Sequence, residues 1–299
     1  MSRTGTILAL GNTAGRGLPH LPLAAWITPG VLIGVALCGL AYGVAMWSPA
    51  IRDLPGVEPP TRGQVVYFAA ALVALYLSLG SPIGALAMGY SFTAHMFQHM
   101  IAALAVPPFL IKGLPKWVWR WLLRPRPVRF VFGYLVRPVQ AILVFNTVFA
   151  VMILPSVIAA MVHSMAAMVL WHLGLVVAGV LMWWPLLSPL EEFPRLHPGL
   201  QTLYLVADGM PMLLPFVLVT LDNHPLYRLA YGADPRILGL SLVADQNLGG
   251  ALCLVLVHAV YGSMLMARFM DWVRMEPALD PELAKAADKQ RRRFAVVRP

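Results

Sequence analysis

The sequence predicts an all-α membrane protein, a seven-span transmembrane helical bundle with its N-terminus outside and its C-terminus in the cytoplasm. Of the 299 residues, 59% are hydrophobic and only 12% are charged, whereas about 25% of the residues in a typical soluble domain are charged. Mean hydropathy is +0.73. Apolar stretches recur along the chain, each close to the roughly 20 residues that a helix needs to cross a bilayer.

These stretches define the spans in order. The spans are expected at residues 28–47, 64–79, 92–111, 130–154, 164–187, 200–221 and 246–269. The first two are continuous apolar segments, and the third contains two histidines. Pro138 interrupts the fourth span, and Pro211 and Pro215 lie inside the sixth. Tryptophan and tyrosine occur near many of the expected ends, as is typical of residues at a membrane interface.

The spans form one domain with two extensions. Residues 1–27 are expected to be an external N-terminal segment, residues 28–269 the transmembrane domain, and residues 270–299 a basic cytoplasmic tail. The sequence contains no phosphate-binding glycine loop, nucleophile elbow or CxxC pair, so no enzyme is predicted. The net charge of +9 lies between apolar runs and in the tail, so nucleic acid is not an expected partner.

Basic residues concentrate in alternate connecting segments, which sets the predicted orientation. One group follows the third span: Lys112, Lys116, Arg120, Arg124, Arg126 and Arg129. A second follows the seventh span: Lys285, Lys289, Arg291, Arg292, Arg293 and Arg298. Residues 80–90 and 155–162 carry no charge. Because basic loops stay in the cytoplasm, we predict a multi-pass protein of the cytoplasmic membrane with an external N-terminus.

The third span carries the strongest candidate site, His95 and His99. Four residues are about one helical turn, so both imidazoles lie on one face of the helix. Met96 and Met100 directly follow the two histidines. Imidazole and thioether ligands together suit a soft metal ion such as copper(I). Ionisable groups inside a membrane span are costly, and they usually indicate function.

The fifth and seventh spans add further candidate metal ligands. Met168 and His172 are four residues apart and share a helix face, and His163 begins the fifth span. His258 lies near the middle of the seventh span. For His163 and His258, an interhelical hydrogen bond explains the residue as well as metal binding does. We therefore centre the copper(I) hypothesis on His95, His99 and His172, with Met168 as an adaptable fourth ligand.

Three charged residues near the spans have structural interpretations. Arg137 and Asp208 lie at similar depths in the inner half of the bundle, and their opposite charges predict an ion pair. Asp245 precedes Gly249 and Gly250 at the start of the seventh span, where it is expected to cap that helix. The long external stretch 222–245 is expected to form a lid over the outer end.

An ordered set of motifs resembles a known family. The motifs are HMFQHM (95–100), VPP (106–108), WHLGLVVAGVLMWWPLL (171–187), DNHPLYRLAY (222–231) and DQNLGGALCLVLVHAVYG (245–262). Together they resemble the polytopic CtaG-type assembly factors of bacterial cytochrome c oxidase. The resemblance implies a seven-span inner-membrane protein, required for active caa-type oxidase and involved in copper handling. In the relatives a histidine stands four residues before the one matching His172, and here that position is Met168.

The resemblance also implies cytochrome c oxidase subunits in the same membrane as partners. An external copper chaperone is a further expected partner. Two other functions remain open at this point. One is a membrane redox protein that holds haem b between histidines of different helices. The other is a copper or small-solute permease, which a helix broken at Pro211 and Pro215 in the sixth span would support.

Overall fold

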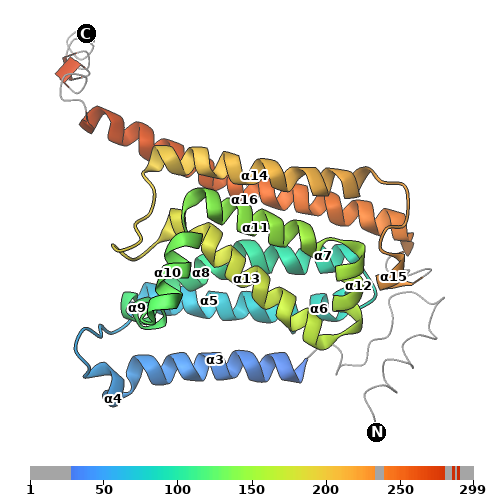
Figure 1. Ribbon diagram of the computed structural model, residues 1–299, viewed down its shortest axis with the longest axis horizontal. Coiled ribbons are helices and arrows are strands. Elements are labelled where there is room, and N and C mark those ends of the chain that lie inside the picture. Colours follow the sequence, from blue (N-terminus) through green and yellow to red (C-terminus); the bar gives the residue numbers. More distant parts are fainter. Residues whose placement is uncertain (1–27, 233–238, 280–284, 287, 290–299) are drawn as a thin grey trace, which may run out of the picture.

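The computed structural model describes residues 28–232, 239–279, 285–286 and 288–289. The described chain is helical, and it contains no strand. The long helices lie side by side in one bundle (Figure 1). The predicted external segment 1–27, part of the predicted lid (233–238) and most of the predicted tail lie outside the described residues.

The helices follow the predicted spans closely. They are α3 (Pro29–Trp47), α4 (Pro49–Arg52), α5 (Arg62–Leu79), α6 (Pro82–Ala87), α7 (Phe92–Met100), the π-helix η1 (Ile101–Ala105), α8 (Val106–Gly113), α9 (Lys116–Leu122), α10 (Arg126–Leu135), α11 (Pro138–Met152), α12 (Pro155–His163), α13 (Met165–Leu187), α14 (Pro198–Leu221), α15 (Arg228–Tyr231) and α16 (Leu242–Leu279). In the described part of the chain, 6 helices are long and apolar enough to cross a membrane. The count rises to 7 if α10 and α11 form one bent span. The all-α membrane bundle is thus confirmed.

The fourth predicted span, 130–154, is less continuous than the sequence suggested. The axes of α10 and α11 meet at an angle of 87°. Arg137 has extended backbone angles (φ −63°, ψ 142°) and Pro138 begins α11. Proline disfavours helical geometry at the preceding residue and has no N–H to donate. Pro138 therefore starts a new helix, and the 15 residues of α11 cover only about 22 Å.

The core lies between α7, α8, α11, α13, α14 and α16, which pack against one another. Helix α3 lies at the edge of the bundle and packs mainly on α5 (Figure 1). Its leucines Leu32, Leu37 and Leu40 are exposed, as expected for side chains that face lipid. Tyr42 connects α3 to the bundle, because its hydroxyl donates to the carbonyl of Gly113 at 3.2 Å.

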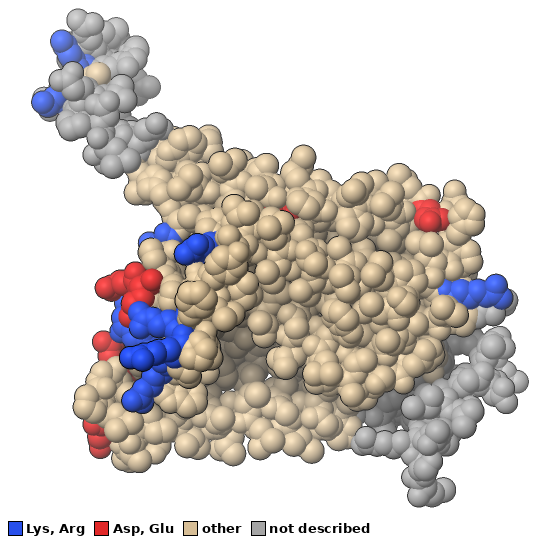
Figure 2. All heavy atoms as spheres, viewed as in Figure 1, with Lys and Arg blue, Asp and Glu red and all other residues tan. Residues whose placement is uncertain are grey.

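Exposed charged side chains gather at the ends of the bundle. On the face shown in Figure 2, the sides between the two ends are almost entirely uncharged. At the end formed by α9 and α10, Arg120 pairs with Glu192 at 2.9 Å and Lys116 with Glu191 at 3.8 Å. Helices α6, α12 and α15 lie at the other end (Figure 1). Uncharged sides fit a lipid environment, and which end faces the cytoplasm stays a prediction.

Candidate functional site

The N-terminus of α7 is capped by its own N-cap residue and by a side chain of α16. Ser91 is the N-cap, and its hydroxyl accepts from the N–H of Ala94 at 3.2 Å. The carboxylate of Asp245 accepts from the N–H of Phe92 at 2.6 Å and of Thr93 at 3.2 Å, and from the Ser91 hydroxyl at 2.8 Å. These amides have no partner inside α7, so Asp245 supplies one from α16. The expectation that Asp245 caps its own helix was wrong, because α16 already begins at Leu242.

Two glycines let α16 come close enough for this contact. A Cβ atom on Gly249 would lie 2.6 Å from Cδ1 of Phe92, and one on Gly250 would lie 2.4 Å from Oγ1 of Thr220. Real side-chain atoms do not approach this closely. The pair therefore allows α16 to pack against α7 on one side and against α14 on the other.

Three histidines meet in the core beyond this cap. His95 and His99 lie one turn apart on α7, and His172 reaches them from α13. The distance between ring centroids is 4.6 Å for His95 and His99, 5.0 Å for His99 and His172, and 6.2 Å for His95 and His172. Their exposed fractions are 0%, 0% and 2%. The structure thus brings together the three residues at the centre of the sequence hypothesis.

The hydrogen bonds of this histidine cluster leave nitrogen atoms unused. Nδ1 of His172 donates to the carbonyl of Met168 at 2.8 Å, since a carbonyl can only accept. Nε2 of His172 therefore carries a lone pair, and this buried atom has no partner among the described residues. Nδ1 of His99 is also buried, and it too has no hydrogen-bond partner among the described residues. Buried polar atoms are normally hydrogen-bonded, so two exceptions in one cluster favour a ligand site.

Tyr231 orients the first histidine. Its hydroxyl lies 2.8 Å from Nδ1 of His95, while Nε2 of His95 lies 3.1 Å from Nε2 of His99. Tyr231 belongs to α15, within the 222–231 motif, and it is 5% exposed. One turn earlier, Tyr227 stacks on Phe92 with ring centroids 4.0 Å apart. The described part of the predicted lid thus forms the wall of the histidine cluster.

The helix that carries His95 and His99 changes geometry directly after them. Residues Ile101–Ala105 form a π-helix, and Pro107 follows in α8. Proline cannot donate to the carbonyl four residues earlier, which is that of Ala103. The indole N–H of Trp183 on α13 donates to this carbonyl at 3.1 Å instead. Such π-segments are frequent at functional sites, and this one fixes α7 against the helix of His172.

The other predicted ligands lie in different surroundings. Met168 is 2% exposed and lies one turn before His172 on α13. His163 ends α12 rather than beginning the fifth span, and its exposed ring donates to the carbonyl of Leu229 at 3.0 Å. His258 is exposed on α16, and its Nδ1 donates to the carbonyl of Leu254 at 2.6 Å. The structure does not bring His163 or His258 into the histidine cluster.

The predicted ion pair between Arg137 and Asp208 was wrong. Asp208 is fully buried on α14, and its carboxyl group binds Nδ2 of Asn146 at 2.9 Å and the hydroxyl of Tyr261. Arg137 is exposed, with its guanidinium 5.6 Å from the ring centroid of Tyr134. Because the chain bends at Pro138, Arg137 lies at the corner between α10 and α11, where its side chain is exposed. Asn146 and Tyr261 were missed because amide and phenol side chains carry no charge pattern.

The spacing of the histidine nitrogens bears on metal binding. No group of three or more His, Cys, Asp or Glu side chains in the described chain can hold a metal ion as it stands. Two imidazole nitrogens bound to one ion at about 2.0–2.1 Å each lie roughly 3.3 Å apart in tetrahedral geometry. The 3.1 Å between the Nε2 atoms of His95 and His99 is close to this. These two atoms share one hydrogen bond in the structure, so it is their spacing, and not their present hydrogen bonding, that fits a pair of metal ligands.

Comparison with known proteins gives one match. The family model Caa3_CtaG, described as "Cytochrome c oxidase caa3 assembly factor", matches residues 40–275, well over half of the chain. No curated protein and no solved structure matches the chain. The matched range includes all three clustered histidines, as well as Tyr231 and Asp245.

Proposed function

The chain belongs to the cytochrome c oxidase caa3 assembly factor family, and we propose that it binds one copper(I) ion at His95, His99 and His172 for maturation of an oxidase metal centre. The observation that carries this proposal is the meeting of three buried imidazoles, two of which have a nitrogen without a partner. Copper is the cargo of the protein in this proposal, and no turnover chemistry is required.

The chemistry of the cluster favours a monovalent soft ion. All three ligands are neutral when they bind a metal, and no carboxylate is among the hydrogen-bond partners of the three rings. A divalent ion would bring two uncompensated charges into the core, whereas copper(I) brings one. Imidazole and thioether are ligands that copper(I) accepts. Met168, one turn from His172, is the adaptable fourth ligand of the proposal.

The cluster is less suited to haem b. A haem held between His95 and His172 needs its macrocycle between the two rings. The ring of His99 contacts both of these rings, at centroid distances of 4.6 Å and 5.0 Å, and it occupies the space that the macrocycle needs. Copper(I) needs no such space, since it binds between nitrogen atoms that are already close.

The proposal places the protein in a bacterial cytoplasmic membrane, beside the oxidase subunits that receive the copper. Tyr231 and the rest of α15 cover the cluster, so cargo enters or leaves where this segment opens. An external copper chaperone is the expected donor if this end faces outward. Fusions of a reporter to Lys116 and to Gly84 test that orientation, because opposite signals are expected from the two ends.

The direct test is copper(I) titration of the purified, reduced protein in detergent against a competing chelator. Wild type should bind one copper(I) per chain, and His99→Ala should bind none. His258→Ala is the matched control, because it removes a histidine of a span that lies outside the cluster. Full copper binding by a folded His99→Ala protein would refute the proposal.

A further inference from the structure

A second buried polar group remains outside the proposed copper site. Asp208 is 0% exposed, and no Lys, Arg or His side chain in the described chain forms an ion pair with it. Isolated charge at membrane depth is costly and is normally paired or neutralised. Both oxygens of Asp208 do have hydrogen-bond partners. What the group lacks is a counter-charge.

We propose that Asp208 is a proton-binding site, protonated at neutral pH, that exchanges its proton through Tyr261. The oxygen–oxygen contact between Asp208 and Tyr261 fits either direction of donation. In the protonated form, the carboxyl O–H donates to the Tyr261 hydroxyl. That hydroxyl then donates to Sδ of Met182, which lies 3.7 Å away. Every donor in this series of hydrogen bonds then has an acceptor, and no charge is buried.

The ionised form is less well accommodated. Tyr261 must then donate to Asp208, and the sulfur of Met182 loses its donor. Asn146 still donates to Oδ1 at 2.9 Å, but two neutral donors do not offset a full charge in a low-dielectric core. The hydrogen bonding around Asp208 thus matches a neutral carboxylic acid.

The helices packed on α14 contribute no cation to this site. Helix α16 contributes Tyr261 and, one turn earlier, His258, whose Nδ1 is held by the Leu254 carbonyl. Helix α11 contributes Asn146. On α14 itself, the Tyr204 hydroxyl donates to the carbonyl of Met182 at 2.7 Å. The titratable groups that face Asp208 are therefore two tyrosines and, further away, one histidine.

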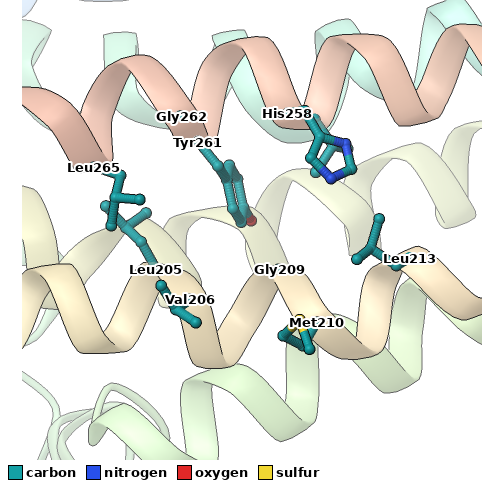
Figure 3. Close-up of a pocket in the computed structure, with 10 residues that line it drawn as sticks. Leu205, Val206, Gly209, Met210, Leu213, His258, Tyr261, Gly262 and Leu265 are labelled. Atoms are coloured by element: carbon teal, nitrogen blue, oxygen red, sulfur yellow. The ribbon is translucent and has the colours of Figure 1, made fainter.

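A groove between α14 and α16 provides the route for the proton. Its volume is about 210 Å³, and Gly209, His258, Tyr261 and Gly262 are among the residues that line it. Figure 3 shows the Tyr261 ring at this groove, with its oxygen toward α14. Tyr261 thus contacts the groove and Asp208 at once. The other lining residues, apart from His258, are apolar. For the proton to leave, the Tyr261 hydroxyl turns from Met182 to a water molecule in the groove, gives that water its hydrogen and takes the carboxyl proton of Asp208 in exchange.

The proton site affects copper, a consequence that rests on the proposed function. Met182, which connects to Asp208 through Tyr261, follows His172 on α13 by ten residues, or about 15 Å of helix. We take the same order of distance for the separation between Asp208 and the histidines. Two unit charges at that distance, in an effective dielectric constant of about 20, change each other's binding roughly sixfold. Ionised Asp208 favours a cation at the histidines, and a bound cation favours loss of the proton.

The first test is infrared spectroscopy of the full-length protein at neutral pH, without copper. Wild type should show the carbonyl band of a protonated carboxylic acid, and Asp208→Asn should lack this band. Asp222→Asn is the control, because Asp222 is at the end of α14 and its carboxylate binds His224. Identical spectra for wild type and Asp208→Asn would overturn the proposal. Should Asp208→Asn fail to fold, Tyr261→Phe should shift the frequency of the same band.

The second test addresses the route, using the rate at which the band shifts after transfer to heavy water. A Cβ atom on Gly262 would meet no atom within 4 Å, and Gly262 lines the groove, so Gly262→Leu should fold and fill the groove. It should slow the shift at least several-fold. Gly174→Leu is the matched control, because Gly174 on α13 is equally open but outside the groove. Equal rates in the two variants would exclude the groove as the route.

The third test separates this inference from the proposed function. Copper(I) affinity is measured against pH for wild type and Asp208→Asn. Wild type should gain up to about sixfold in affinity over Asp208→Asn as Asp208 ionises. Parallel curves would refute the coupling. If neither protein binds copper, the proposed function fails, whereas the infrared assignment of the proton stands.

Discussion

The bundle buries two polar clusters, one around His95, His99 and His172 and the other around Asp208, and each lacks a different partner. In the histidine cluster, two ring nitrogens have no hydrogen-bond partner among the described residues. In the Asp208 cluster, both carboxyl oxygens are hydrogen-bonded, but no cation in the described part of the chain balances the group. We therefore propose a metal ion as the partner of the first cluster and a proton as the partner of the second.

The two clusters also differ in how the helices support them. The histidines lie beside a π-helix and below a cap made by Asp245 from another helix. Asp208 lies inside a continuous α-helix and binds residues of α11 and α16. The first arrangement presents ring nitrogens to one another, while the second surrounds a single carboxyl group with neutral donors. Substitutions in the two clusters should therefore have opposite consequences for binding and for stability.

The largest expected effect is on copper in the histidine cluster. His172→Leu removes the nitrogen that has no partner, so copper(I) affinity should fall at least ~1,000-fold, about 4 kcal/mol. The apoprotein should be as stable as wild type or more so, because Nδ1 of His172 bonds only within its own helix. Copper titration and the thermal unfolding midpoint measure the two effects. A clear fall in apoprotein stability would show that the histidine is structural.

The next effect is on stability, and it belongs to the Asp208 cluster. Asp208→Leu removes the carboxyl hydrogen bonds to Asn146 and Tyr261, although Asn146 keeps the carbonyl of Ile142 and Tyr261 keeps the sulfur of Met182. The free energy of unfolding should fall by about 1–3 kcal/mol. Asp208→Asn keeps both contacts and should be close to wild type. The midpoints of thermal unfolding in one detergent decide this comparison. Equal midpoints for the two variants would mean that these hydrogen bonds contribute nothing.

The smallest expected effect is on copper affinity, and it concerns Tyr231 in the wall of the histidine cluster. Tyr231→Phe removes the hydroxyl that lies 2.8 Å from His95 but keeps the ring in the core. Loss of a group that orients a ligand typically costs about 10–100-fold in metal affinity, and we expect the lower end. Tyr227→Phe is the control, because its hydroxyl donates to the Ile153 carbonyl instead. Unchanged affinity in Tyr231→Phe would show that α15 only covers the site.

The sequence by itself determined the membrane bundle and the local pairs. The length of the apolar stretches and the scarcity of charged residues predict where the helices lie, because a bilayer requires both in every span. The helical period put His95 and His99 on one face, and likewise Met168 and His172. Each of these inferences concerns residues within about one turn of each other, where backbone geometry alone fixes the relation.

Only the tertiary structure decided which distant residues meet. It joined His172 to the α7 histidines, brought Tyr231 to His95, and placed Asp245 on the start of α7. It also showed that the partners of Asp208 are Asn146 and Tyr261, and not Arg137 as the sequence suggested. These contacts depend on the packing of helices and on the 87° bend at Pro138. Sequence periodicity describes one helix at a time, whereas the faces that helices turn toward each other are set by the whole bundle.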